Sequence, residues 1–205
     1  MTIGIAIAGS HVRTFATPKD PAIAEFLKKG FASINLGQPE QALIDARKAI
    51  ELNSKSAEAY FLLGRAQQDI GMKSESLSSY SKAIELAPGY TAAYSNRGLV
   101  KGSLSDLKGA IADFNQALEL DKSFAAAYLN RGVATGAMGD SKKALADFNS
   151  AIKANPNYIN AYENRGITKE MIGDLKGACS DWKKAASLGS TQARKWHSAQ
   201  CTDMP

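Results

Sequence analysis

A glycine recurs at a constant spacing of 34 residues along most of this 205-residue chain. A period of this length indicates a stack of similar structural units, because each unit then offers its neighbours the same packing surface. The glycines are Gly30, Gly64, Gly98, Gly132 and Gly166. The blocks around them align without gaps and cover residues 23–56, 57–90, 91–124, 125–158 and 159–192.

Each block has the pattern of a helical hairpin. A second glycine, or Ser105 in the third block, suits a left-handed turn at the end of a first helix. Asp106, Asp140 and Asp174 then suit the N-cap of a second helix. The repeated glycine facing an alanine of the second helix would let the two backbones approach closely. An aromatic residue stands four positions before the glycine in every block: Phe26, Tyr60, Tyr94, Tyr128 and Tyr162.

The period, the aromatic, the glycine and the alanines together resemble the tetratricopeptide repeat (TPR). This resemblance implies an all-α fold, a right-handed superhelical solenoid of five helical hairpins over residues 23–192. Residues 193–205 are then a capping helix and tail that cover the apolar face of the last hairpin. The Asn-Arg-Gly triplets of three blocks and the Asp-Trp-Lys-Lys-Ala segment that starts at Asp181 are similar to bacterial members of this family.

A basic residue stands directly before the glycine, and an aspartate stands sixteen positions after that basic residue. The two change together between blocks. The pairs are Lys29 with Asp45, Arg97 with Asp113, Arg131 with Asp147, and Arg165 with Asp181. In the second block both members are replaced, by Leu63 and Ser79. This joint replacement predicts an ion pair between the two helices of a hairpin, with a structural rather than a catalytic role.

Catalytic and metal-binding patterns are absent from the sequence. His11 and His197 stand at opposite ends of the chain, and no histidine and cysteine cluster has the spacing of metal ligands. We therefore expect no enzymatic activity, no metal and no cofactor. Cys179 takes the position of a buried second-helix residue and Cys201 lies on the predicted capping helix, so a disulfide between them fits an oxidising compartment.

The first 22 residues form a leader with two interpretations. The segment MTIGIAIAG and a potential cleavage after Ala16 fit a secretory signal peptide, although basic residues do not precede the apolar core. The alternative is a disordered cytoplasmic tail. The protein is extracytoplasmic, in a periplasm or lumen, under the first interpretation and cytoplasmic under the second. No stretch of the sequence is apolar for long enough to span a membrane, so we expect membrane association only through a partner.

The net charge of +5 is spread over the blocks. Nucleic-acid binding usually needs lysine and arginine gathered on one face, together with groups that contact bases. The sequence therefore favours a surface of mixed charge and another protein, rather than a nucleic acid, as the partner.

Side chains of the first helices are expected to line a concave groove. Three asparagines in register, Asn96, Asn130 and Asn164, form a predicted ladder. Each amide could donate to and accept from the backbone of an extended peptide, or could instead bond its own helix or water. The residues that follow the glycines lie beside the ladder: Phe31, Arg65, Leu99, Val133 and Ile167.

The clamp with which some family members hold the carboxyl terminus of a chaperone is absent. If the first repeat of the clamp is aligned with the first block, the matching positions hold Leu27 and Phe31 in place of lysine and asparagine. If it is aligned with the second block, they hold Phe61 and Arg65. We include Phe61 and Arg65 in the predicted groove. The sequence thus predicts a scaffold, either an adaptor or an assembly factor, that binds a peptide or a helix. The alternative is a structural module that self-associates through the ends of the solenoid.

Overall fold

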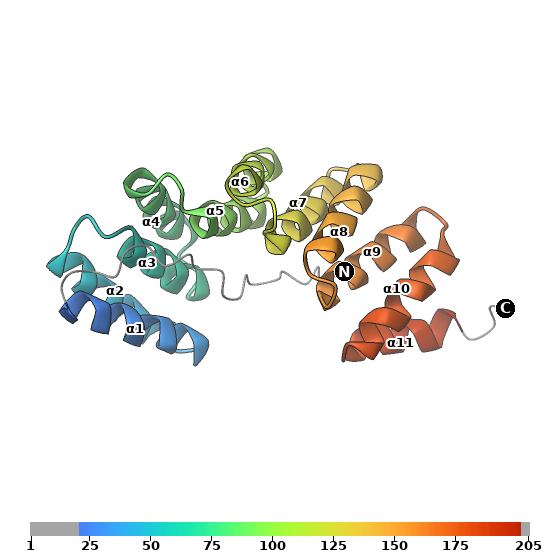
Figure 1. Ribbon diagram of the computed structural model, residues 1–205, viewed down its shortest axis with the longest axis horizontal. Helices are drawn as coiled ribbons and strands as arrows, with labels where there is room; N and C mark the ends of the chain where they lie inside the picture. The colour runs from blue at the N-terminus through green and yellow to red at the C-terminus, as the bar shows by residue number, and fades with distance from the viewer. Residues whose placement is uncertain (1–20, 202–205) are drawn as a thin grey trace. The chain divides into compact units, whose positions relative to one another are not determined.

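The computed structural model describes residues 21–201, and every regular element among them is an α-helix (Figure 1). The prediction of an all-α helical-repeat fold is confirmed. Among the described helices, none is both long and apolar enough to cross a membrane. Residues 1–20, with most of the predicted leader and His11, and residues 202–205 lie outside the described residues. The helices are α1 (Pro21–Asn35), α2 (Pro39–Leu52), α3 (Ala57–Asp69), α4 (Lys73–Leu86), α5 (Thr91–Ser103), α6 (Leu107–Leu120), α7 (Ala125–Ala137), α8 (Ser141–Ala154), α9 (Ile159–Met171), α10 (Leu175–Ser187) and α11 (Thr191–Gln200).

The chain divides into two compact units, one with α1–α6 and one that begins at Asp121 and holds α7–α11. In each unit the helices pair as hairpins, and the second helix of one hairpin packs against the first helix of the next. The first helices α1, α3 and α5 contact one another in order, as do α7 and α9 in the other unit. Each unit therefore has a row of adjacent first helices.

The turn inside each hairpin has the backbone that the sequence predicts. Ser105, where the third block lacks glycine, has a φ of 66°, so a residue with a Cβ is held in the left-handed region that favours glycine. The other four turns use glycine, with φ of 69°, 84°, 86° and 87° at Gly37, Gly71, Gly139 and Gly173. The predicted aspartate caps are also present: Asp106 accepts from Gly109 N, Asp140 from Lys143 N and Asp174 from Gly177 N.

The repeated glycines make room for an aromatic ring of the second helix. A Cβ added to Gly132 would lie 2.7 Å from Phe148 Cε1 and 3.2 Å from the backbone oxygen of Ala144. The nearest group is thus the ring, and not the alanine side chain that the sequence suggested. The equivalent glycines of the other hairpins meet Tyr80, Phe114 and Trp182.

In the first hairpin a different side chain fills the space beside the repeated glycine. Its second helix has Ala46 where the others have an aromatic ring, and Leu62 of α3 fills the space against Gly30 instead. Leu62 stands where three other blocks have asparagine, and it is fully buried. The two exceptions to the repeat pattern, Ala46 and Leu62, therefore compensate for each other in space.

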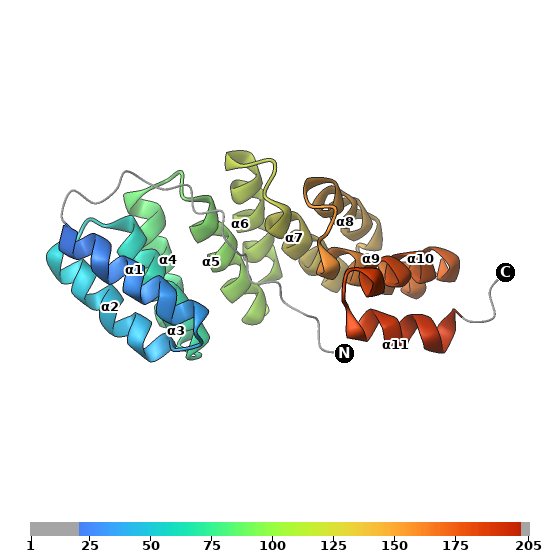
Figure 2. The same cartoon turned by 60° about the horizontal axis from the view of Figure 1, so that its bottom comes forward.

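Helix α11 covers the last hairpin and lies along α10 in both views (Figures 1 and 2). The Trp182 and Trp196 rings lie 5.8 Å apart between centroids. Cys179 and Cys201 form a disulfide bond, with their Cα atoms 5.7 Å apart. Ser190 caps the helix by accepting from Ala193 N, and its hydroxyl donates to Glu163 of α9. A polar bond, a covalent bond and an aromatic contact thus hold α11 in place.

Candidate functional site

The predicted ion pairs are present in the third, fourth and fifth hairpins. Arg97 of α5 binds Asp113 of α6 through two hydrogen bonds, from Nε at 2.9 Å and from Nη2 at 2.7 Å. This pairing raises the pKa of the Arg97 guanidinium above its ordinary value. The guanidinium also lies 5.7 Å from the centroid of the Tyr94 ring, where a cation–π contact is favourable. Arg131 with Asp147 and Tyr128, and Arg165 with Asp181 and Tyr162, repeat the arrangement.

The first two hairpins differ from this pattern. The prediction for Lys29 is wrong, because its Nζ pairs with Glu25 at 2.6 Å, one turn earlier on the same helix, and not with Asp45. Lysine is long and flexible, and a nearby carboxylate on its own helix face is reached more easily than one on the next helix. In the second hairpin, Ser79 donates to Gln67 at 2.6 Å, so a neutral hydrogen bond replaces the ion pair.

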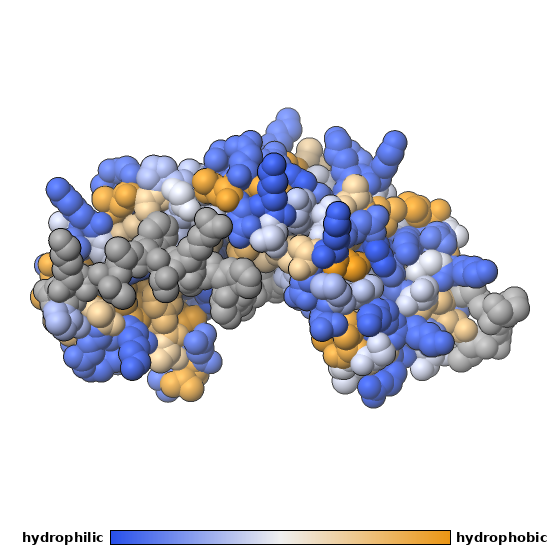
Figure 3. Space-filling view, in the orientation of Figure 1, coloured by the Kyte–Doolittle hydropathy of each residue, from blue (hydrophilic) through white to orange (hydrophobic). Residues whose placement is uncertain are grey.

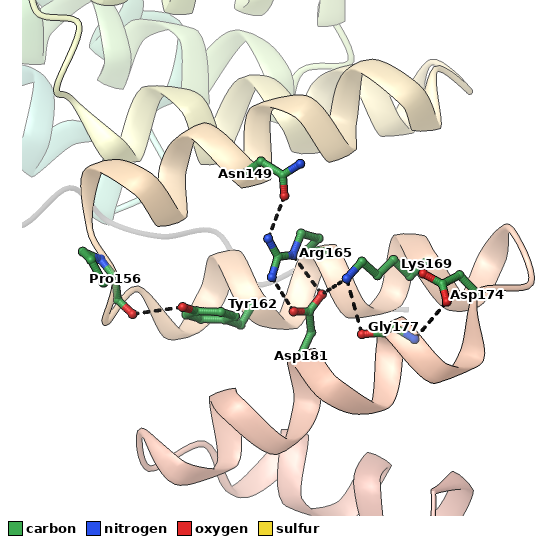
Figure 4. A network of polar contacts seen from close by, with 8 residues as sticks. All are labelled: Asn149, Pro156, Tyr162, Arg165, Lys169, Asp174, Gly177 and Asp181. Carbon is green, nitrogen blue, oxygen red and sulfur yellow. Dashed lines mark hydrogen bonds and ion pairs between the residues drawn. The ribbon is translucent and has the colours of Figure 1, made fainter. Parts of the chain in front are cut away.

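The last of these networks also joins neighbouring hairpins (Figure 4). Arg165 Nη1 donates to Asn149 of α8 at 2.6 Å, and Lys169 pairs with the second oxygen of Asp181 at 2.9 Å. The Asp181 carboxylate is therefore bound by two cations and buried. Asp181 ties α10 to α9, and Arg165 extends the network to α8, so the network positions three helices.

The three predicted ladder asparagines lie against their own helices. Asn96 is 2% exposed and Asn130 is 5% exposed, whereas Asn164 is half-buried. The Nδ2 atoms of Asn96 and Asn164 donate to the backbone oxygens of Ala92 and Asn160, both at 2.8 Å. Asn130 Nδ2 is buried without a hydrogen-bond partner. The amide nitrogens of Asn96 and Asn164 therefore bond their own helices, as in the alternative interpretation, whereas that of Asn130 does not.

Most of the other predicted groove residues remain accessible. Phe31, Arg65, Leu99, Val133 and Ile167 are all half-buried on the first helices. Phe61 is different, because it is 3% exposed and packs against Tyr80 and Tyr90 at centroid distances of 5.7 and 4.8 Å. Phe61 is thus a core residue, and the accessible set consists of the residues that follow each glycine.

Sequence reasoning missed a second set of accessible apolar residues. The residue that directly follows each first helix is apolar in every hairpin, and four of the five are exposed: Leu36, Leu104, Met138 and Ile172. Figure 3 shows hydrophobic surface beside hydrophilic side chains around the α9–α10 turn, where Met171 and Leu175 are also exposed. The 34-residue spacing of these positions was the signal that could have revealed them. Within residues 21–201, no group of histidine, cysteine and carboxylate side chains could hold a metal ion.

The TPR family matches more than half of the chain. The match described as tetratricopeptide repeat covers residues 26–56, 57–90 and 125–158, and a second, described as TPR repeat, covers residues 102–139. These segments include residues of every hairpin except the last.

Several solved structures are similar to the chain. The crystal structure of MamA has a TM-score of 0.68 and 25% identity over 80% of this chain and 96% of that chain. TTC0263, a thermophilic TPR protein of Thermus thermophilus, has a TM-score of 0.75 and 19% identity over 87% and 98%. YrrB, a TPR protein with an unusual peptide-binding site, has a TM-score of 0.64 and 22% identity over 85% and 90%. The last two likenesses show the fold alone. With its 34-residue period, its ring-and-glycine hairpins and these matches, the chain belongs to the tetratricopeptide-repeat family.

Proposed function

We propose that this protein is a non-enzymatic scaffold, an adaptor or assembly factor, that binds an extended peptide or a helix of another protein along its first helices. One observation carries this proposal. Val133 and Ile167 occupy equivalent places on the first helices α7 and α9 of one unit and remain half-exposed, although the glycine before each is tightly packed. Leu99 has the same place on α5 of the other unit. Accessible apolar side chains repeated along a row can bury surface against a partner. Membership of the TPR family supports a role in protein interaction.

In this proposal the apolar residues supply most of the affinity and the asparagines supply less. Asn96 and Asn164 already donate to their own helices, so a partner backbone would have to replace those bonds. Exchanging one hydrogen bond for another changes the free energy of binding by about 0.5–1.5 kcal/mol or less. Asn164→Ala should therefore weaken binding less than Ile167→Asp does.

The test begins with affinity purification on the full chain and continues with calorimetric titration of the recovered partner. Val133→Asp places a charge where the partner's apolar surface would bind, which we expect to cost about 1–3 kcal/mol, or roughly 5- to 150-fold in Kd. Ala112→Asp on the exposed surface of α6 is the matched control and should change Kd by less than about twofold. If Val133→Asp folds normally and binds as tightly as the wild type, the proposed surface is not the binding site.

Self-association through the solenoid ends, the alternative, has less support at the carboxyl-terminal end. Helix α11 already covers the apolar face of α10 through Trp196 and Cys201. The side chains that α11 exposes include Arg194, Lys195 and Ser198. A second copy would meet this polar surface and not an open apolar face.

A further inference from the structure

The solvent-facing charges of the second helices differ between the two units. In the unit of α1–α6, cations and carboxylates alternate on α2, α4 and α6. The cations are Arg47, Lys48, Lys73, Lys82 and Lys108, and the carboxylates are Glu40, Glu51, Glu75, Glu85 and Glu119. The surface of these helices is therefore close to neutral.

The charged side chains that the second helices of the other unit expose are all cations. The carboxylates within α8 and α10 are Asp147 and Asp181, both buried and both paired with an arginine of the first helix. The helix α11 contains no carboxylate. The exposed cations of the three helices are Lys142, Lys143, Lys153, Lys176, Lys183, Lys184, Arg194 and Lys195. We call these eight residues the cationic surface.

A sum of charges along the sequence conceals this surface. In such a sum the exposed lysines are offset by carboxylates outside the second helices, namely Glu163 and Glu170 of α9 and Asp140 and Asp174 of the turns. Asp147 and Asp181 are each balanced inside the hairpin, by Arg131 and Arg165. Among the described residues, only Lys143 of the cationic surface forms an ion pair, with Asp140 at 2.9 Å. The other seven cations are left to attract an anionic partner.

We propose that the cationic surface is a second docking site, separate from the row of first helices, and that it binds an acidic segment of a protein rich in aspartate and glutamate. Charge complementarity selects the partner, because exposed lysines steer and hold carboxylates over the distance of a Debye length. The accessible apolar residues of the first helices contribute a different, neutral surface, so this inference goes beyond the proposed function and does not depend on it.

One feature favours an acidic protein segment over a nucleic acid. The aromatic residues of α8, α10 and α11 are buried or half-buried, so bases of a nucleic acid would find no exposed ring on which to stack.

The test compares two charge-reversal variants of the full chain. The first, Lys142→Glu/Lys176→Glu/Lys183→Glu, changes the cationic surface; two of its glutamates fall in the first turn of a helix, where a negative charge is favourable. The second, Arg47→Glu/Lys73→Glu/Lys108→Glu, makes the same change of net charge on α2, α4 and α6. Lys108 stands at the position of the repeat that holds Lys142 and Lys176. Circular dichroism checks that both variants fold.

The probe is a fluorescein-labelled poly-L-glutamate peptide, with binding measured by fluorescence anisotropy. We expect the first variant to lose at least about tenfold in affinity and the second to stay within about twofold of the wild type. Binding of the wild type should weaken steeply between about 50 and 200 mM salt. Equal losses in both variants would reduce the effect to net charge and overturn the proposal. Tighter binding of phosphatidylserine vesicles or duplex DNA than of the peptide would overturn the choice of an acidic protein segment.

Discussion

The contact between Gly132 and Phe148 gives the sharpest test of how the hairpins pack. In Gly132→Ala, the new Cβ would lie 2.7 and 2.9 Å from two carbons of the Phe148 ring, closer than carbon atoms normally approach. Phe148 is itself buried against Leu129 and Ala151, so the ring has little room to move away. The same helix offers a matched control, because a Cβ on Gly136 would meet Ala144 Cβ at an ordinary 3.5 Å.

The magnitudes follow from two opposing effects. Replacing glycine by alanine inside a helix stabilises it by about 1 kcal/mol, since glycine has more backbone entropy to lose. Overpacking a filled interior costs about 1–3 kcal/mol. Gly136→Ala should therefore raise the free energy of unfolding by up to about 1 kcal/mol. Gly132→Ala should leave it unchanged or lower it by about 2 kcal/mol, so that the two variants differ by about 1–3 kcal/mol.

Thermal unfolding followed by circular dichroism measures this difference. In a chain of this size about 1 kcal/mol corresponds to roughly 2–4 °C, so Gly132→Ala should melt several degrees below Gly136→Ala. Gly132→Ala should cost less stability in a protein that already carries Phe148→Leu than in the wild type, because the obstructing ring is gone. Equal melting temperatures for the two alanine variants would refute the close packing of glycine and ring.

Three further predictions concern the ion pair, the cap and a half-buried acid. Asp147→Ser alone should destabilise more than Asp147→Ser with Arg131→Leu, because the single change leaves the guanidinium unpaired; strict additivity in a double-mutant cycle would exclude the bridge. Reduction of Cys179–Cys201 should increase proteolysis within α11 but leave α1–α9 helical by circular dichroism, and unchanged cleavage of α11 would show that the disulfide is dispensable. Burial raises the pKa of the Glu58 carboxyl, so the folded protein binds the carboxyl proton more tightly than the unfolded protein does. The free energy of unfolding therefore falls as the pH rises from the ordinary pKa of 4.5 to the raised value. Glu58→Gln should thus raise Tm at neutral pH and not below pH 4.5, and an equal shift at both would contradict this.

The hairpins could be predicted from the sequence because their determinants are local and periodic. Glycine or Ser105 at each turn and aspartate at three of the second-helix caps act within a few residues, and the 34-residue period identifies equivalent positions. The joint loss of Arg and Asp in the second block likewise predicted the bridges that Arg97 and Arg165 form. Lys29 was mispredicted because the pattern gave no weight to Glu25 on the same helix.

The surfaces were harder to predict because exposure depends on contacts between hairpins. The three asparagines at equivalent positions were predicted to form an open ladder, yet Asn96 is almost fully buried. The exchange of roles between Ala46 and Leu62 appears only when α2 and α3 are packed together. The cationic surface was likewise hidden, since a sequence sum counts Glu163 and Glu170 of the first helix α9 against the lysines of the second helices.

Site-specific photocrosslinking in living cells tests the proposed binding surface most directly. A photoreactive phenylalanine analogue would replace Ile167 on the first helix α9, or Ala112 on the exposed surface of the second helix α6. Binding along the first helices predicts a covalent adduct with another protein from the Ile167 position and little or none from the Ala112 position. An adduct that forms equally well from both positions, or only from Ala112, would contradict the account.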